Sequence, residues 1–410
     1  MKEKIFVLAL TLITVFALSS KAQHGCQDPL ATNFNSSATA TNSSCIYSVS
    51  SAPLANRIAS LPSILDETSA LLFTDGKVFT INDSGNSADI FQFDSTTGQI
   101  IKTTRISNHS NIDWEDLAAD SSHIYVGDFG NNNGDRTNLR ILKIRKSAVY
   151  HPDSLDTKAE KLSFNYPDQS SFISGSTHNF DCESVFFWGG RLHLFSKNRG
   201  NRKTKHYSLN PNLSTQTAVL HDSLNTNGLI TSASVSSDGK AAVLLGYDQS
   251  GTFPVFVWIL FGFDGSNFFG GNRRRIELPG FFTTGQAEGI GFVSQSRLWV
   301  SNERFGNIPP RVNQLNIASY INPFFTGSRE ELPSAKGQFI FPNPAFNQVL
   351  INLKENESYQ IVNALGGMVA EGNNGQVDLS NMTEGLYFVS IFKQGKPIRG
   401  KNQTLMISHK

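Results

Sequence analysis

The chain has 410 residues, which is more than one ordinary domain holds and enough for two or three. It carries 35 Lys and Arg against 34 Asp and Glu, so no nucleic-acid partner is expected, because phosphate binding needs a concentrated basic face. With 33 Gly, 31 Phe and only 17% charged residues, the composition is typical of a β-rich, turn-rich extracellular protein.

The amino-terminal segment has the pattern of a secretory signal peptide. It begins Met1-Lys-Glu-Lys, continues with an apolar run from Ile5 to Leu18, and ends in a small-residue cleavage site, Ser20-Lys-Ala22. Because the run is shorter than the ~20 residues that a membrane-spanning helix needs, residues 1–22 are predicted to be a signal peptide. Elsewhere the longest apolar stretch is residues 255–263, so no transmembrane segment is expected in the mature chain.

Residues 24–47 are predicted to form a small module. Cys26 and Cys45 bracket this segment of an exported chain, so a disulfide between them is expected, whereas Cys182 is expected to be a buried free thiol. The segment resembles the short Gly-Cys-x-Asp-Pro modules of proteins exported by the type IX secretion system. In that family acidic residues before the second cysteine suggest calcium. Here Thr41-Asn-Ser-Ser44 replaces them, so metal binding by the module is not expected.

Residues 53–320 contain five stretches that can be aligned with one another. Each is a short apolar strand closed by a turn and followed by a second strand, and Asp75-Gly76 and Gly189-Gly190 are typical hairpin dipeptides. The aligned stretches start at Ser69, Glu115, Glu183, Ser232 and Glu288. Because each interval has room for two more alternating strands, the pattern predicts a β-propeller of four-stranded blades.

The number of blades depends on how the ring closes. The fifth stretch is followed by a third strand, residues 312–317, and then the pattern stops. Residues 55–59, at the other end, are predicted to supply its fourth strand, which would join the first and last blades and remove exposed sheet edges. Five blades are therefore favoured. Six are the alternative, because the long interval from 115 to 183 has room for a degenerate unit.

A linker is predicted at residues 321–334, and residues 335–410 form a separate C-terminal region. It opens with Phe341-Pro-Asn-Pro-Ala345 and contains Met382-Thr-Glu-Gly-Leu-Tyr387 within alternating strands. This region resembles the type A C-terminal sorting domain of type IX secretion substrates. The resemblance implies a small β-sandwich, recognition by the type IX machinery, and a protein secreted by, or held on the outer-membrane surface of, a Gram-negative bacterium.

Candidate site residues follow from the geometry of a propeller, in which the first strand of each blade lines the central channel. The loops before this strand and after the second strand open on one face, where carboxylates and cations would converge. The predicted ligand-binding residues are Glu67, Glu115, Asp116, Glu183, Glu288, Lys197, Arg199, Asn302 and Arg304. The predicted metal ligands are Asp83, Asp128 and Asp135, with calcium as the candidate ion.

A structural interpretation competes with this functional one. Carboxylates at the starts of inner strands can accept backbone N–H groups of neighbouring blades and so tie the ring together. Residues 113–116 and 127–135 have the Asp, Asn and Gly density of a cation-binding loop but lack the spacing of an EF-hand, and a set of Asx turns would explain them equally well. The sequence leaves both interpretations open.

Three motifs give the propeller region a resemblance to secreted propellers of the phytase and esterase-like kind: Asn82-Asp-Ser-Gly85, Trp114-Glu-Asp-Leu117 and Gly127-Asp-Phe-Gly-Asn131. The expected function is a recognition module that binds a cation or an unknown polar extracellular ligand. The alternative is a calcium-assisted hydrolase of phosphoesters or esters. No nucleophile elbow or phosphate loop occurs, so whether the protein is an enzyme is left open.

Overall fold

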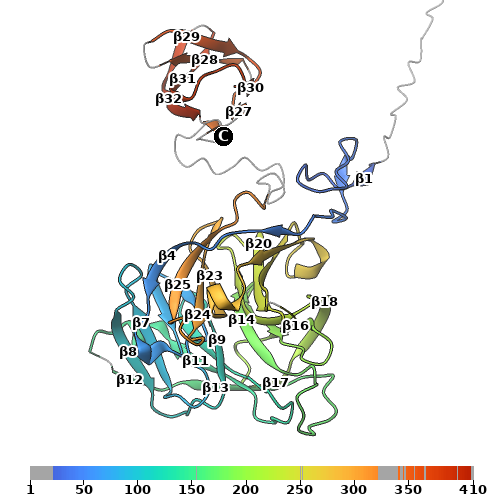
Figure 1. Cartoon of the computed structure of the whole chain (residues 1–410), viewed down its shortest axis with the longest axis vertical. Coiled ribbons are helices and arrows are strands. Elements are labelled where there is room, and N and C mark those ends of the chain that lie inside the picture. Colours follow the sequence, from blue (N-terminus) through green and yellow to red (C-terminus); the bar gives the residue numbers. More distant parts are fainter. Residues whose placement is uncertain are drawn as a thin grey trace, which may run out of the picture. The chain divides into compact units, whose positions relative to one another are not determined.

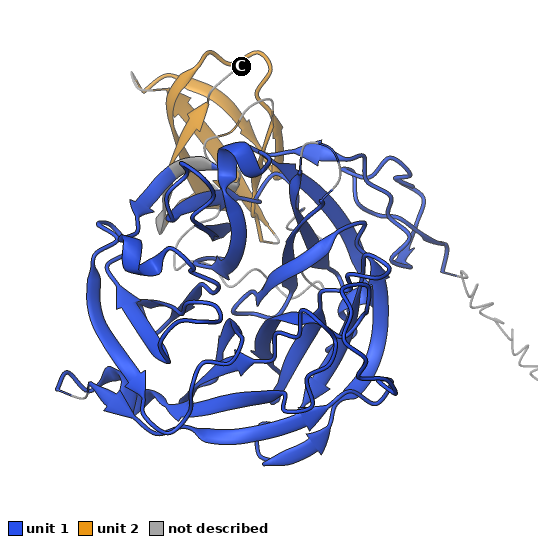
Figure 2. Ribbon diagram, turned by 60° about the horizontal axis from the view of Figure 1, so that its bottom comes forward, with its two compact units in different colours: residues 1–327 blue, residues 328–410 orange. Residues whose placement is uncertain are grey.

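The computed structural model describes residues 22–321, apart from residues 154, 250 and 252, and residues 340–407, with gaps at 342–344, 346–347, 355, 364–365 and 395. The chain divides into unit 1, residues 1–327, and unit 2, residues 328–410 (Figure 2). Strands dominate both units, which confirms the all-β prediction. The predicted signal peptide and linker lie almost entirely outside the described residues.

The described part of unit 1 contains five sheets, each built on four antiparallel strands (Figures 1 and 2). The first has β5 (Leu72–Thr74), β6 (Lys77–Thr80), β7 (Asp89–Phe93) and β8 (Ile100–Ile106); the second has β9 (Trp114–Ala119), β10 (His123–Asp128), β11 (Arg140–Arg145) and β13 (Glu160–Asn165). The third has β14 (Cys182–Trp188), β15 (Arg191–Ser196), β16 (Lys203–Leu209) and β18 (Val219–Asn225). The fourth has β19 (Leu229–Val235), β20 (Ala241–Tyr247), β21 (Val255–Phe261) and β22 (Asn272–Leu278); the fifth has β23 (Gln286–Phe292), β24 (Arg297–Glu303), β25 (Arg311–Asn316) and β4 (Ala55–Ser60).

The five sheets close into a ring. The inner strands contact one another in the order β5, β9, β14, β19 and β23, and β23 contacts β5 again. Strand β4 pairs antiparallel with β25, with Ala59 opposite Val312, so the amino-terminal segment forms the outer strand of the last sheet, as the sequence predicts. Figure 1 shows β4 in blue beside β25 in orange. This arrangement is that of a β-propeller.

Short strands and helices complete unit 1 at its edges. Strands β12 (Asp156–Thr157), β17 (Thr215–Thr217) and β3 (Ser50–Ser51) add in parallel to the outer strands of the first, second and fourth sheets. They cover edges that would otherwise expose unpaired backbone groups. The helices are η1 (Ser63–Leu65), α1 (Lys146–Tyr150), η2 (Phe268–Gly270) and α2 (Phe281–Thr284).

Apolar residues that alternate along the strands fill the spaces between neighbouring sheets. One such cluster joins the fourth and fifth sheets and includes Val257, Ile259, Leu298 and Val300, all with no exposed surface. Burial of these faces supplies the main driving force for closing the ring. Two-residue turns reverse the inner hairpins of the first and third sheets, and at Asp75-Gly76 both residues have positive φ, 50° and 71°, which the dipeptide tolerates.

The amino-terminal module contains β1 (His24–Gly25) and β2 (Ala40–Thr41), which pair in parallel. A disulfide joins Cys26 and Cys45, as the sequence predicts. The module is fixed at its end by Tyr47, whose hydroxyl donates to Asp28 at 2.8 Å and whose ring packs 5.8 Å from that of Phe261.

Unit 2 is a small β-sandwich. One sheet contains β26 (Ile340–Phe341), β27 (Gln348–Ile351) and β30 (Gln376–Asp378); the other contains β29 (Met368–Gly372), β28 (Glu357–Asn363), β31 (Gly385–Lys393) and β32 (Lys396–Ile407). Residues alternate between the core and solvent along β31, where Tyr387, Val389 and Ile391 are buried. Such alternation is what a two-layer sandwich requires.

Candidate functional site

Four inner strands carry an extra residue near their starts. The cross-strand register shifts by one at this point, which leaves Glu115, Glu183, Thr231 and Glu288 without a partner in the ladder. A β-bulge of this kind turns the extra side chain out of the strand's normal alternation. The fold therefore places a side chain from each of these sheets at the same level of the ring.

Ser69 holds the corresponding position in the first sheet. Its hydroxyl donates to the carbonyl oxygen of Trp114 at 3.1 Å, just as the Thr231 hydroxyl donates to that of Ala287 at 2.9 Å. The sequence alignment of the fourth stretch was wrong by one residue, because Ser232 pairs with Leu245 and Thr231 occupies the bulge.

Two more sets of residues surround the bulges, one before each inner strand and one after each second strand. Sheet by sheet, the facing pairs are Glu67 and Asp83, Asp113 and Phe129, Asp181 and Lys197, Leu229 and Tyr247, and Gln286 and Glu303. We call these ten positions, together with Ser69, Glu115, Glu183, Thr231 and Glu288, the mouth of the ring.

Three carboxylates of the mouth form a compact group. One oxygen from each of Asp83, Asp113 and Glu115 lies within 4.8 Å of the others. Burial, aided by the charges of Asp83 and Asp181, raises the pKa of Asp113 to about 7. Burial and the charge of Glu183 likewise raise the pKa of Glu115. Hard oxygen ligands at this spacing are what a divalent cation such as calcium prefers.

The backbone at Gly130 runs directly against this group. A Cβ atom at position 130 would lie 2.0 Å from an oxygen of Glu115 and 2.6 Å from the carboxylate of Asp113. Any side chain there would displace the carboxylates. Close packing against the carboxylates therefore explains why residue 130 is a glycine, which the sequence alone did not reveal.

Two buried cations balance a neighbouring pair of carboxylates. Lys197 forms a salt bridge with Glu183, and Arg199 bonds Asp181 at 2.8 Å and lies 3.6 Å from Glu183. Burial opposes the charge of Lys197, but the carboxylate of Glu183 outweighs this effect and raises the pKa of Lys197. The Lys197 ammonium also lies 5.2 Å from the ring centre of Tyr247.

Two further buried carboxylates of the mouth, Glu288 and Glu303, form no salt bridge with the described residues. Glu288 accepts a hydrogen bond from the Gln286 amide at 2.8 Å. Burial and the charge of Glu288 raise the pKa of Glu303 to about 10, so Glu303 holds its proton at neutral pH. The buried or half-buried carboxylates of the mouth are thus Asp83, Asp113, Glu115, Asp181, Glu183, Glu288 and Glu303. Among the described residues only Lys197 and Arg199 form salt bridges with them, and such an excess of charge is relieved by protons or by a bound cation.

Asp116 was predicted to bind ligand. In the structure its carboxylate accepts hydrogen bonds from residues of two neighbouring sheets. Its Oδ2 accepts the Val185 N–H at 3.0 Å and the Ser232 hydroxyl at 3.3 Å, which links the second, third and fourth sheets. Ser232 also accepts the N–H of Ile290 at 3.2 Å. This geometry fits the alternative that the sequence left open, in which a carboxylate of an inner strand links neighbouring blades.

The predicted metal ligands do not gather at one place. Asp83 belongs to the carboxylate group described above, but Asp128 bonds Arg136 at 2.9 Å and Arg140 at 2.7 Å, so its oxygens are engaged by guanidinium groups. Asp135 is exposed on the following loop. Only one of the three therefore lies with Asp113 and Glu115.

Three other predicted residues lie at the edge of the mouth. Glu67 is exposed, and its carbonyl oxygen accepts the N–H of Asp83. Asn302 is buried and donates to the carbonyl oxygens of Glu303 and Pro309. Arg304 is 42% exposed and bonds Asp66 at 2.6 Å, so it is engaged outside the carboxylate group.

The sequence prediction missed Asp181 and treated Asp113 only as part of a loop. A signal was present, because an acidic residue stands two positions before the bulge residue in both Asp113-Trp-Glu115 and Asp181-Cys-Glu183. Cys182, between Asp181 and Glu183, is a buried free thiol whose pKa burial raises to about 12, which favours the protonated thiol at neutral pH.

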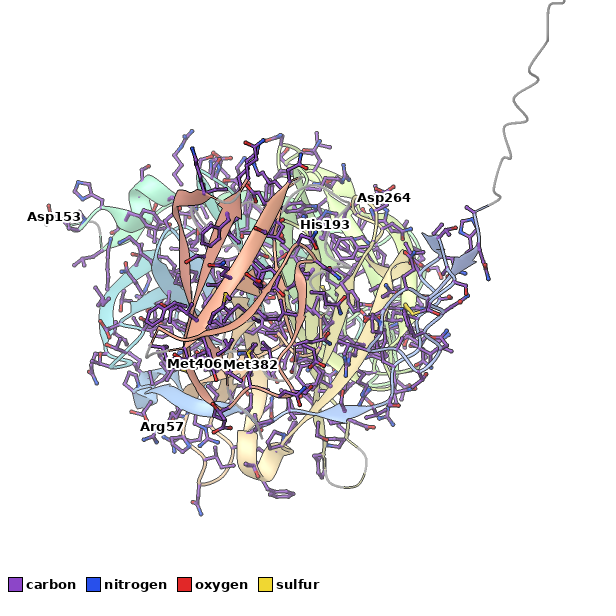
Figure 3. The ribbon with its side chains drawn as sticks, turned by 90° about the horizontal axis from the view of Figure 1, so that it is seen from above. Arg57, Asp153, His193, Asp264, Met382 and Met406 are labelled. Atoms are coloured by element: carbon purple, nitrogen blue, oxygen red, sulfur yellow. A yellow bond between two sulfur atoms is a disulfide. The ribbon has the colours of Figure 1, made fainter. Side chains whose placement is uncertain are left out.

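A second cluster of titratable groups lies in the third sheet, with His193 and His206 buried and His221 exposed. His193, labelled in Figure 3, hydrogen-bonds His206 at 2.8 Å, and the ring of His221 stacks 4.6 Å from that of His206. Burial among phenylalanine rings lowers the pKa of His193 to about 4. Neutral imidazoles in this setting pack as part of the core.

Comparison with known proteins identifies the C-terminal region. Residues 339–403 match the family described as the secretion system C-terminal sorting domain. This match supports the predicted type IX sorting domain and means that the chain is exported through that system, as a secreted or cell-surface protein. No curated protein matches the chain. In the part of the chain that the structure describes, no helix is long and apolar enough to cross a membrane.

Several solved structures are similar to the chain at low identity. Hydrazine synthase from Kuenenia stuttgartiensis is 11% identical with a TM-score of 0.31, and the match covers 64% of each chain. A candidate 6-phosphogluconolactonase from Bacteroides uniformis is 13% identical over 86% of each chain, with a TM-score of 0.31. An α-L-arabinofuranosidase from Podospora anserina is 11% identical over 65% of this chain and 98% of its own, with a TM-score of 0.39. TM-scores this low say nothing about what the chain binds.

Proposed function

We propose that unit 1 is an exported recognition module that binds a divalent cation through Asp83, Asp113 and Glu115. Calcium is the expected ion, and the bound ion would hold a polar extracellular ligand at the mouth of the ring. The observation that supports this proposal best is the placement of three carboxylate oxygens within 4.8 Å of one another. No salt bridge to any of the three is present among the described residues.

The chemistry of the group suits calcium. Calcium takes six to eight oxygen ligands, and three carboxylates supply three to six of them, which leaves positions for water or ligand hydroxyls. Asp83 is only half-buried, so a ligand can approach the ion from solvent. Extracellular calcium sites bind with dissociation constants on the order of 10⁻⁴ to 10⁻³ M, and we expect a value in that range.

A calcium titration of the full mature chain tests the proposal. We expect the melting temperature, measured after EDTA treatment, to rise as calcium is added to about 10 mM, because the ion binds only the folded state. Asp113→Asn should abolish the rise, whereas Asp135→Asn, which changes an exposed carboxylate in the nearby loop, should retain it. A wild-type protein without any calcium-dependent rise would refute the proposal.

A calcium-assisted hydrolase of esters or phosphoesters is the second candidate. It is favoured by Glu303, a protonated carboxyl group whose pKa burial and the charges of Glu288 and Asp83 raise to about 10. Such a group could donate a proton to a leaving group while the ion polarises the substrate. Calcium-dependent turnover of chromogenic esters or phosphates that Glu303→Gln abolishes would favour the hydrolase. Calcium binding without turnover would favour the recognition module.

A further inference from the structure

The mouth of the ring is acidic on one side and aromatic on the other. The fourth sheet contributes Leu229, Thr231 and Tyr247 and no carboxylate at the positions where the other sheets carry acidic residues. Tyr247 packs edge-on against Phe281 of helix α2, with ring centroids 4.8 Å apart. Phe281 in turn packs 5.4 Å from Phe305. A row of contacting aromatic rings therefore runs from Tyr247 at the mouth through Phe281 to Phe305.

An exposed aromatic surface lies at the end of this chain. Phe282 directs 74% of its surface to solvent, and its ring lies 6.5 Å from that of Phe253 and 6.1 Å from that of Phe305. We call Phe253, Phe282 and Phe305 the aromatic platform. Phe253 has a φ of 52°, a left-handed conformation that bulky residues seldom adopt and that is found preferentially at functional sites.

A short helix presents the platform beside the acidic residues. Helix α2 turns Phe281 into the core and Phe282 outward, and it ends at Thr284; at the next residue, Gly285, a φ of 83° lets the chain turn into β23. Gln286, the first residue of β23, donates to Glu288. Phe305 follows Glu303 by two residues. The platform is thus connected by short segments to two carboxylates of the mouth.

An open depression adjoins Phe282. It has a volume of about 430 Å³ and is lined by Pro254, Glu277, Leu278, Gly280, Phe282 and Thr283. This volume lies within the range of small-molecule sites, and its wall combines apolar surface with a carboxylate and an exposed hydroxyl. Such a wall suits a ligand that has both an apolar face and hydroxyl groups.

We propose that the aromatic platform and this depression form a saccharide-binding subsite. The apolar face of a neutral sugar ring would stack on Phe282, and its hydroxyls would hydrogen-bond the exposed Thr283 hydroxyl. Glu277, whose Oε1 accepts from Arg275 at 2.6 Å, lines the wall beside it. The carboxylates at the mouth disfavour anionic ligands, and the wall of the depression offers apolar surface and an exposed hydroxyl, so a neutral polyhydroxylated chain is the complementary partner. The inference rests on the proposed function, because the ligand held at this subsite would be the same polar extracellular ligand that the bound ion holds at the mouth of the ring.

Affinity electrophoresis of the full mature chain tests this subsite. The gels would contain neutral arabinoxylan, galactomannan or mixed-linkage β-glucan, with and without calcium. We expect at least one polysaccharide to retard the wild-type protein, and Phe282→Ala to raise the dissociation constant about fivefold to tenfold. Phe282→Tyr, which keeps an aromatic face, should retain binding. The control is Phe388→Ala in unit 2, which removes another exposed phenylalanine ring, 43% exposed against 74% for Phe282, and should leave binding unchanged.

The outcomes separate the subsite from the cation site. Saccharide binding that needs Phe282 but ignores both EDTA and Asp113→Asn would support the subsite and remove calcium from the recognition model. Calcium binding without retardation by any polysaccharide would overturn the subsite and leave the cation site standing. Retardation that Phe282→Ala and Phe305→Ala both leave intact would also overturn it. So would binding of a cationic probe such as polylysine at the platform in place of the saccharides.

Discussion

Glu115 and Asp116 are neighbours in the sequence and have opposite environments in the ring. Asp116 accepts hydrogen bonds from Val185 and Ser232 on two other sheets, so its carboxylate is matched by donors. Glu115 lies instead with Asp83 and Asp113, where carboxylates face one another. Burial alone therefore does not distinguish a structural carboxylate from a candidate ligand. The hydrogen-bond donors around the carboxylate distinguish the two.

The β-bulge is the physical origin of this difference. Asp116 pairs with Gly127 and keeps the alternation of β9, whereas Glu115 is the unpaired residue beside it. Because successive residues of a strand point to opposite faces, one inserted residue is enough to re-aim a single side chain. The same device recurs at Glu183 and Glu288, so the ring collects acidic side chains at one level.

The largest expected effect is a loss of stability when the carboxylate of Asp116 is removed. Asp116→Ala should lower the free energy of unfolding by about 3 kcal/mol, because the Val185 N–H and the Ser232 hydroxyl would remain buried without an acceptor. Denaturant unfolding of the calcium-free protein measures this loss. Asp135→Ala, an exposed change, should stay within about 0.5 kcal/mol. A change in unfolding free energy for Asp116→Ala as small as that for Asp135→Ala would contradict the structural role of Asp116.

The crowded carboxylates should couple calcium binding to pH. With a pKa of about 7, Asp113 is largely protonated at pH 6 and ionised at pH 8. Only the ionised form binds calcium, so the dissociation constant should fall about tenfold from pH 6 to pH 8. Isothermal titration calorimetry at the two pH values measures the change. An affinity independent of pH would mean that Asp113 is not a ligand.

The smallest expected effect is a gain of stability. The pKa of Asp113 is raised on folding, so the folded state holds this proton more tightly and the calcium-free protein loses stability as pH rises toward 7. Asp113→Asn removes the titrating group. At pH 8, without calcium, it should therefore be more stable than the wild type by about 1 kcal/mol, as is common for functional sites. Destabilisation would place Asp113 with Asp116 among the structural carboxylates.

Much of the architecture could be predicted because its signals are local. The turn at Asp75-Gly76, the Cys26–Cys45 disulfide and the sorting domain each depend on a few neighbouring residues or on one compact region. The pairing of β4 with β25 was predicted because the sequence pattern of the last sheet lacks a fourth strand. That inference worked because exposed sheet edges are unfavourable.

The site was predicted less well because it depends on register. The sequence analysis grouped Asp83 with Asp128 as metal ligands. In the structure Asn82 pairs with Thr68 and Asp128 with Trp114, so Asp128 corresponds to Asn82 and Phe129 to Asp83. An error of one residue moves a side chain to the opposite face of a strand. Asp128 therefore meets two arginines and not the other carboxylates.

By itself, the sequence determined the all-β class, the strand turns, the module's disulfide and the export domain, because each follows from side chains close together along the chain. Only the tertiary structure decided which acidic residues meet. Residues 83, 113 and 115 converge because ring closure brings two sheets together and a bulge re-aims one side chain. Neither effect leaves a local signal, since both depend on how separate strands pair.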